Sequence, residues 1–218
     1  MTFKACCLLG VIACGGRVES TVADSGASDA GSSDAGSNVV VLHPDAGALP
    51  GESSCKVTIT TRIPVATALH VATCSSVSYA TNPPSGGDHW PIWSALKKYT
   101  RPVPREMYVH NLEHGTVVLA YRCAPACPDV VGALSAVFDK AVDPRCGVHP
   151  RVVLTPDAKL PTPIAAVGWG ATYTATCIDP TSLQNFTNQA IGHGSEDLCD
   201  DGVDLDRGDP CETPGDAG

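Results

Sequence analysis

The sequence has few basic residues and no stretch of them on which a nucleic acid could dock. Its 218 residues include 14 Lys and Arg against 23 Asp and Glu, a formal net charge of −9, and most of the acidic excess lies before residue 55 and after residue 193. Phosphate backbones are bound by stripes of Lys and Arg. We therefore expect no nucleic-acid partner, and a folded core that is nearly neutral.

The sequence also lacks an apolar run long enough to span a bilayer, which takes about 20 residues. The short run in "MTFKACCLLGVIACGG" is instead typical of an export signal, and the small residues before Cys14 resemble the end of a bacterial lipoprotein signal. We predict a signal peptide over residues 1–13 and lipidation of Cys14. The protein would then lie in the bacterial cell envelope, lipid-anchored to a membrane, at a periplasmic or outer-membrane surface.

The cysteines fit an exported chain. Three of the 11 lie at or before Cys14, which leaves an even number, and an even number outside the cytoplasm indicates disulfides. Proximity in sequence favours the pairs Cys123 with Cys127 and Cys199 with Cys211. "CAPAC" is not the two-spacer redox motif, so a structural role is the simpler interpretation. The candidates are Cys55, Cys74, Cys123, Cys127, Cys146, Cys177, Cys199 and Cys211.

Composition divides the chain into segments. Residues 14–54 are dominated by Ser, Gly, Ala and Asp, and they predict a flexible tether without a core of its own. Residues 55–193 carry nearly all large apolar residues and have the length of one domain, without internal repeats. Residues 194–218 form an acidic tail.

The sequence of residues 55–193 predicts an α+β fold. We predict one disulfide-stapled domain with a mixed or antiparallel sheet and two or three packed helices. Alternating or continuous β-branched runs indicate strands, and apolar residues at helical spacing after Pro128 and Pro180 indicate helices. The expected strands are 56–63, 116–121, 151–155 and 164–169, and the expected helices are 128–142 and 179–191.

The clearest chemical signal is "YVHNLEHGTVVLAYRC", residues 108–123, with His110, Glu113 and His114 within five positions. On a helix the two imidazoles would lie about 6 Å apart on one face, whereas on a strand they would be about 13 Å apart. A tight turn or single helical loop at 111–115, which Gly115 permits, would bring them together. The spacing also fits the H-x-x-E-H pattern of zinc peptidases, but that pattern needs a long helix, and here a strand follows at once.

A second motif lies upstream in "YATNPPSGGDHWPIW", residues 79–93. The two prolines hold the chain extended, Ser-Gly-Gly turns it, and His89 follows Asp88, a candidate hydrogen-bonding partner. Two His-bearing turns far apart in sequence favour one shared site.

Together these two motifs resemble the bacterial DUF3105 family. "NPPSGGDHW" is similar to its N-P-P-[ST]-S-G-P-H-[WY] motif, with Gly86 and Asp88 as departures, and "VHNLEHGTVVLAY" is similar to its V-H-N-L-E-H-G motif. The resemblance covers about residues 55–193. It implies that certain positions belong to the family signature, namely His70, His89, His110, Glu113 and His114.

We therefore predict a transition-metal site, Cu or Zn, with His70, His89, His110 and His114 as ligands and Glu113 as a further ligand or as a base acting on bound water. Two alternatives stay open. One is a non-catalytic binding or structural module in which the imidazoles brace turns by bonding backbone carbonyls. The other is a metal-dependent hydrolase. The sequence identifies no protein or small-molecule partner.

The tail sequence "CDDGVDLDRGDPC" resembles acidic calcium-binding repeats of secreted bacterial proteins. Oxygen ligands suit Ca²⁺, but the repeat is single and Arg207 brings a positive charge, so a solvated acidic tail is the competing interpretation. The candidate calcium ligands are Asp201, Asp204, Asp206 and Asp209.

Overall fold

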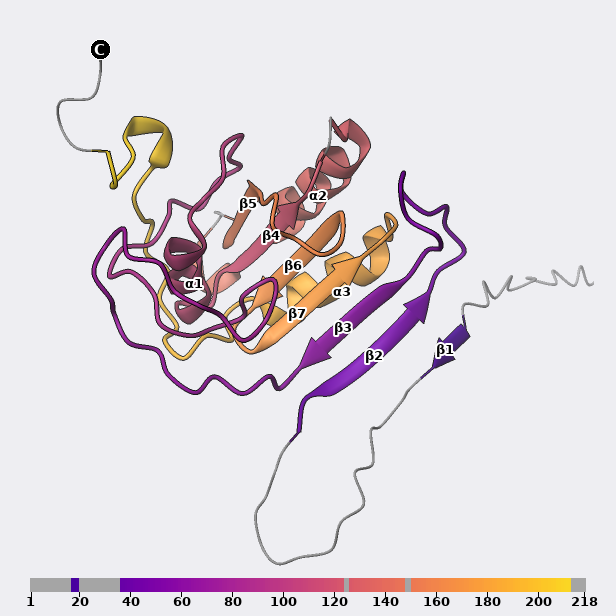
Figure 1. Ribbon diagram of the computed structural model, residues 1–218, viewed down its shortest axis with the longest axis horizontal. Coiled ribbons are helices and arrows are strands. Elements are labelled where there is room, and N and C mark those ends of the chain that lie inside the picture. Colours follow the sequence, from indigo (N-terminus) through magenta and orange to yellow (C-terminus); the bar gives the residue numbers. More distant parts are fainter. Residues whose placement is uncertain (1–16, 20–35, 124–125, 148–149, 213–218) are drawn as a thin grey trace, which may run out of the picture.

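The computed structural model describes residues 17–19, 36–123, 126–147 and 150–212. Its centre is a sheet of seven strands in the order β1-β2-β3-β7-β6-β4-β5 (Figure 1). β4 and β5 are parallel and the other neighbours are antiparallel, so the sheet is mixed. The α+β prediction is confirmed, with three α-helices. The strands are β1 Arg17–Glu19, β2 Asn38–His43, β3 Val57–Thr61, β4 Val117–Tyr121, β5 Val152–Pro156, β6 Ile164–Gly168 and β7 Ala171–Ala175, and the helices are α1 Arg105–Glu113, α2 Pro128–Lys140 and α3 Pro180–Ala190.

The central strands are buried on both faces, which explains their continuous apolar sequences. In β4, Val117 and Leu119 pack into the core beneath α2 and α3, while Val118 packs on the opposite side against α1. Leu119 is paired with Leu154 of β5 and with Ala166 of β6. The four expected strands and two expected helices therefore lie where the sequence predicts them.

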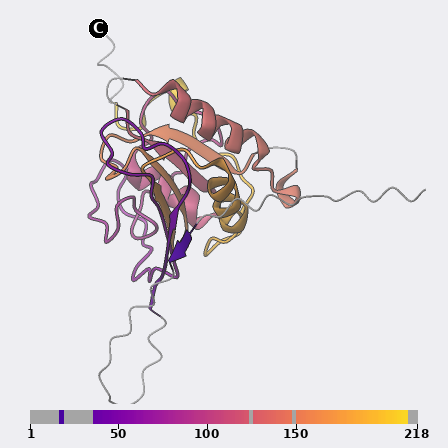
Figure 2. The ribbon, with the colours of Figure 1, turned by 90° about the vertical axis from the view of Figure 1, so that its right-hand side faces the viewer.

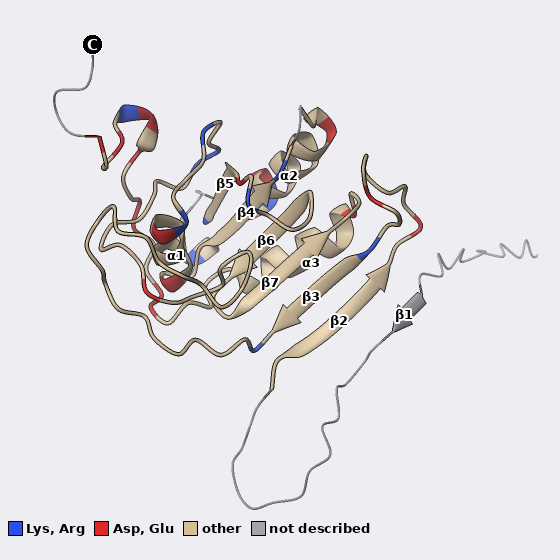
Figure 3. Ribbon diagram, viewed as in Figure 1, with Lys and Arg blue, Asp and Glu red and all other residues tan. Residues whose placement is uncertain are grey.

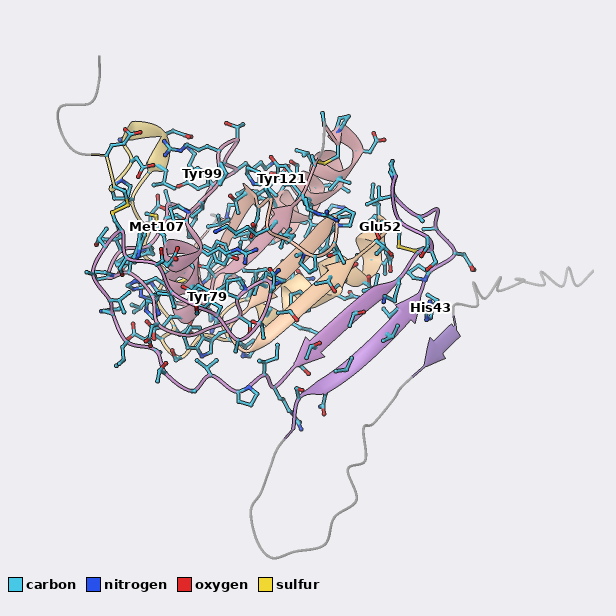
Figure 4. All side chains as sticks on the ribbon, in the orientation of Figure 1. His43, Glu52, Tyr79, Tyr99, Met107 and Tyr121 are labelled. Carbon is cyan, nitrogen blue, oxygen red and sulfur yellow. A yellow bond between two sulfur atoms is a disulfide. The ribbon has the colours of Figure 1, made fainter. Side chains whose placement is uncertain are left out.

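The two faces of the sheet are covered differently. Figure 2 shows the helices α2 and α3 on one side and the segment 62–104, coloured violet to magenta, on the other. This segment has little regular structure, and it covers α1, of which residues 107–113 are all buried. Side chains crowd the side of the molecule where Met107 and Tyr79 are labelled, whereas His43 lies at the far end of β2 (Figure 4).

Four disulfides link the described residues: Cys55–Cys177, Cys74–Cys211, Cys123–Cys127 and Cys146–Cys199. All eight candidate cysteines are paired, and the prediction for Cys123 with Cys127 is confirmed. The predicted pair Cys199–Cys211 is wrong. The chain between these two cysteines packs onto the domain, so each meets a distant partner instead of the other. Four disulfides indicate a non-reducing compartment outside the cytoplasm.

The tether prediction extends too far. Residues 38–43 form β2, which pairs with β3 from Asn38↔Thr61 to Leu42↔Val57, and Leu42 and Leu49 pack against the core. The run "NVVVLH" has strand character that the composition of residues 14–54 as a whole conceals. The predicted signal peptide and the lipidation site Cys14 lie outside the described residues.

The acidic segment also differs from a freely solvated tail. Leu205 is fully buried beside Tyr99, Val203 pairs with Ser94, and two disulfides tie the segment to the domain. Figure 3 shows the described charges in loops, on helices α1 and α2 and at the 3-10 turn near the C-terminus, with few on the central strands. Among the described residues, no helix has the length and apolar character needed to cross a membrane.

Candidate metal centre

The motif of residues 108–123 forms the end of helix α1 and the whole of β4. The expected isolated turn at 111–115 is instead the end of a nine-residue helix, in which residues 110–113 form the last turn and residues 114 and 115 follow it. His110 lies in that turn and His114 is its C-terminal cap, with the His114 amide donating to the His110 carbonyl. Gly115 follows at φ +80°, the left-handed conformation that ends many helices. The helix was missed because its buried residues show no alternation of polar and apolar faces.

The helical end brings the two imidazoles of the motif into contact. Nε2 of His110 lies 3.1 Å from Nε2 of His114. Two ligands of one Zn²⁺ or Cu²⁺ ion with bonds near 2.05 Å are separated by about 2.9–3.4 Å for bond angles between 90° and 110°. The distance therefore suits two ligands of one ion and also suits a hydrogen bond between the rings.

The other two histidines arrive on neighbouring extended segments of the long covering loop. His70 and His89 form an isolated parallel bridge, in which Val71 N–H donates to His89 O at 2.8 Å and His89 N–H donates to Leu69 O at 3.0 Å. The carboxylate of Asp88 accepts from the Leu69 amide at 3.0 Å. Asp88 thus anchors the segment that carries His70, and it does so without a hydrogen bond to the His89 ring.

The structure brings four of the five predicted donors into one cluster. One ligand atom from each of His70, His89, His110 and Glu113 lies within 4.8 Å of the others. His70 is solvent-exposed and the other three are buried. Ligands of one tetrahedral ion lie about 3.4 Å apart, so a closed shell would require the widest pair to approach by up to about 1.4 Å. His114 adjoins this group through His110.

Backbone carbonyls fix the orientation of two of the rings. Nδ1 of His89 lies 2.8 Å from Gly87 O, and Nδ1 of His110 lies 2.6 Å from Trp90 O. A carbonyl only accepts, so each Nδ1 carries the hydrogen and each Nε2 is left with a free lone pair. Both lone pairs belong to the cluster. This is the arrangement in which metal-binding histidines are commonly held.

The lone pair of His89 faces another acceptor. Its Nε2 is fully buried, lies 2.9 Å from Glu113 Oε2 and has no hydrogen-bond partner among the described residues. Ser195 Oγ donates to the other carboxylate oxygen, Oε1, at 3.2 Å. A nitrogen lone pair and a carboxylate oxygen this close repel each other unless a cation lies at their junction. That cation is either a proton on Nε2, which makes the pair a salt bridge, or a metal ion that both groups bind.

Burial also favours the neutral form of the His110 and His114 imidazoles. The pKa of His110 is lowered to about 4, mainly by removal from water and also by the neighbouring imidazoles, while the hydrogen bond to the Trp90 carbonyl opposes the shift. Burial likewise lowers the pKa of His114, against the opposing effect of nearby carboxylates, first among them Glu196. Both rings are thus available as neutral nitrogen donors at neutral pH.

Asn111 fixes the segment that carries Trp93, whose ring packs against the histidine cluster. Its side chain accepts from the amide and the hydroxyl of Ser94, at 3.0 and 2.8 Å, and donates to Ser94 O at 2.8 Å. The adjacent Trp93 ring then packs with its centroid 4.9 Å from that of His110 and 4.6 Å from that of His114. Trp169 lies 6.4 Å from His89, and Trp90 holds His110 through its carbonyl, so all three tryptophans border the cluster. The sequence motifs did not point to the roles of Ser94, Asn111 or Ser195, although Trp90 and Trp93 close to His89 were a signal for the aromatic contacts.

The aspartates proposed for calcium make other contacts. Asp204 and Asp206 both bind Lys97, at 3.0 and 2.6 Å, and Asp209 binds Arg101. Asp201 accepts from the Leu96 amide. Calcium binding by these residues stays a prediction, and their present partners tie the acidic segment to the domain. Of the histidines outside the motifs, His43 and His193 are exposed and His149 lies outside the described residues.

Together, the fold and the cluster define a disulfide-linked α+β domain with a buried His/Glu group capable of holding a metal ion. The model of a family described as "Protein of unknown function (DUF3105)" matches residues 70–201, which include all of the cluster and most of the domain. The chain belongs to the DUF3105 family. No curated protein and no solved structure matches it significantly.

Proposed function

We propose that the protein binds a transition metal ion, Cu²⁺ or Zn²⁺, through the Nε2 atoms of the histidine cluster, with Glu113 as a carboxylate ligand. The observation that carries this proposal is the convergence of four side chains: His89 Nε2 lies 2.9 Å from Glu113 Oε2, and ligand atoms of His70 and His110 lie within 4.8 Å of this buried pair. Neutral imidazoles and a carboxylate are donors that suit both ions.

The turn-bracing alternative accounts for only half of this geometry. The Nδ1 bonds of His89 and His110 to backbone carbonyls do brace the two turns, as that alternative requires. It gives no reason for ligand atoms of four side chains, His70, His89, His110 and Glu113, to lie within 4.8 Å of one another. Metal ligation accounts for both nitrogens of each ring.

The hydrolase alternative receives less support. A carboxylate that activates bound water needs an oxygen free to accept its proton. Here Oε1 of Glu113 accepts from Ser195 and Oε2 faces His89. These contacts favour Glu113 as a ligand, and we assign no reaction to the site.

We further propose that Cys14 is lipidated and holds the protein at an envelope membrane, where the metal ion would be bound outside the cytoplasm. The disulfides and the lipoprotein-like sequence before Cys14 support this location. Mass spectrometry of the membrane fraction should find diacylglyceryl-modified Cys14 as the first residue. Recovery of the unmodified N-terminus would refute the anchor.

The metal proposal is tested on tag-free protein with its disulfides formed. After incubation with Cu²⁺ or Zn²⁺ and gel filtration, elemental mass spectrometry should find about one ion per chain. His89→Ala and His110→Ala should each abolish stoichiometric retention, and His193→Ala, an exposed histidine outside the cluster, should retain it. Because all three tryptophans border the site, Cu²⁺ should also quench the intrinsic fluorescence. Retention below stoichiometry in the wild type, or unchanged retention in both cluster variants, would refute the proposal.

A further inference from the structure

The C-terminal strap, residues 192–199, runs along the end of helix α1. Three of its backbone amides donate to the carbonyls there: Gly192 to Gly115 at 2.8 Å, Glu196 to Glu113 at 2.9 Å and Leu198 to His114 at 3.3 Å. The last carbonyls of a helix have no partner within the helix. The strap supplies these partners and so fixes the end of α1 that carries the motif.

The strap itself is firmly attached to the domain. Cys199 is bonded to Cys146. The fully buried side chain of Arg151 donates to Leu198 O at 2.9 Å and pairs with Asp197 at 2.7 Å. At Gly194, an added Cβ would overlap the Glu113 carbonyl, so the two segments lie in direct contact. Side chains on the strap therefore have defined positions relative to the cluster.

Two polar side chains of the strap reach the motif. Ser195 donates to Glu113, as described above, and Glu196 Oε2 lies 3.5 Å from His114 Nε2. The same His114 nitrogen lies 3.1 Å from His110 Nε2, which carries a lone pair. His114 Nε2 is therefore the hydrogen-bond donor of the pair. Its hydrogen has two acceptors within reach, the His110 ring and the Glu196 carboxylate.

A metal ion on His110 Nε2 would take the lone pair that accepts from His114. The hydrogen on the buried His114 nitrogen would then lose its acceptor, which is costly in a site removed from water. Glu196 is 55% exposed and free to rotate, so a small movement brings its carboxylate to hydrogen-bonding distance.

From this geometry we propose that Glu196 is a positioning residue of the metal site, which accepts the Nε2 hydrogen of His114 when the ion occupies His110. The inference rests on the proposed metal binding. In this proposal His114 lies next to the ion and donates its hydrogen bond to Glu196 without being a ligand. The strap contributes Glu196 and Ser195 to the surroundings of the site.

The test compares Cu²⁺ affinity, measured by tryptophan quenching against a competing chelator, in Glu196→Ala, Glu196→Gln and the control Asp200→Asn. Loss of a partner behind the ligands typically weakens metal affinity by about 10- to 100-fold, so Glu196→Ala should lose about 10-fold. The Gln amide oxygen still accepts a hydrogen bond, so Glu196→Gln should stay within about 3-fold of the wild type. Asp200→Asn removes a nearby exposed charge and should also have little effect.

A double-mutant cycle separates this role from a general structural one. In a His114→Ala background, Glu196→Ala should have no further effect on affinity, because its partner is gone. The thermal unfolding of the protein before metal is added should be unchanged by Glu196→Ala. If Glu196→Ala and Asp200→Asn have equal effects, or if Glu196→Gln loses as much affinity as Glu196→Ala, nearby charge alone is responsible and the inference is wrong. If the wild type retains no metal, the proposed function fails and this inference falls with it.

Discussion

Replacement of Gly115 by Ala tests whether the end of α1 is built as described. Gly115 has φ +80°, and a Cβ added there would lie 2.9 Å from Arg151 Nη2 and 2.9 Å from the Gly192 Cα. Neither neighbour can move freely, because Arg151 is fully buried in ion pairs and Gly192 donates to the Gly115 carbonyl. The substitution therefore meets both a conformational and a steric obstacle.

The expected magnitude follows from these two obstacles. A residue with a Cβ pays about 1 kcal/mol or slightly more in the left-handed region, and forcing extra volume into a packed contact costs about 1–3 kcal/mol. Gly115→Ala should therefore lower the free energy of unfolding by about 2–4 kcal/mol. Urea unfolding followed by tryptophan fluorescence, under non-reducing conditions, measures this change.

Gly132→Ala is the matched control. Gly132 lies inside α2, and a Cβ there would have no atom within 4 Å. The same substitution should raise stability by about 0.5–1 kcal/mol, because Ala has the better helix propensity. A Gly115→Ala variant within about 0.5 kcal/mol of the wild type, the scatter of ordinary surface changes, would refute the close contact between helix end and strap.

Three further predictions concern stability. Asn111→Ala leaves three buried groups of Ser94 without a hydrogen-bond partner, so the free energy of unfolding in urea should fall by about 3 kcal/mol. The control, Asn188→Ala at an exposed position, should lower it by less than about 0.5 kcal/mol. Equal losses would contradict the role given to the Asn111–Ser94 hydrogen bonds. Hydrogen bonds, chiefly from Arg145 and also from Arg151, hold the pKa of the buried Asp143 below its ordinary range. The ionised Asp143 therefore stabilises the fold above about pH 4, and this stabilisation is lost as the pH falls through the lowered pKa of the folded state. Asp143→Asn should therefore be less stable than the wild type at pH 7, and its stability should fall less steeply than that of the wild type below about pH 4. If the stability of both proteins falls equally with pH in this range, the assignment is wrong. Replacing Cys55 and Cys177 by Ser should lower the free energy of unfolding by about 3 kcal/mol more than replacing Cys123 and Cys127, because the first pair spans 122 residues and the second spans 4. Equal melting temperatures would show that loop length is not decisive.

The parts of the fold that the sequence predicted are those whose burial leaves a pattern. Strands such as 116–121 are apolar throughout because both faces are covered, and α2 shows one apolar stripe because only one face is covered. Helix α1 shows neither pattern, because the sheet, the 62–104 segment and the C-terminal strap bury it on several sides. β2 was hidden in a segment whose average composition suggested a tether.

The candidate site was predictable to the extent that its residues share sequence motifs. His70, His89, His110 and Glu113 were selected from the motifs, and the structure brings them together. The contribution of Ser195 and Glu196 was not predictable, because they belong to a segment whose acidic composition indicated solvent exposure. Their position depends on pairings between distant parts of the chain, Cys146–Cys199 and the contacts of Arg151, which sequence spacing does not encode.

The pairing of β3 with β7 has a consequence for how the protein folds. Val57 lies opposite Ala175, and the long segment between these strands contains His70, His89 and His110. Contacts between residues so far apart form slowly, since the entropy of closing the loop must be overcome first. The Cys55–Cys177 bridge lies next to this junction and can preserve it once formed. If the cluster binds a metal as proposed, uptake should therefore follow folding and oxidation of the chain, and a nascent or reduced chain should bind the ion more weakly than the folded protein.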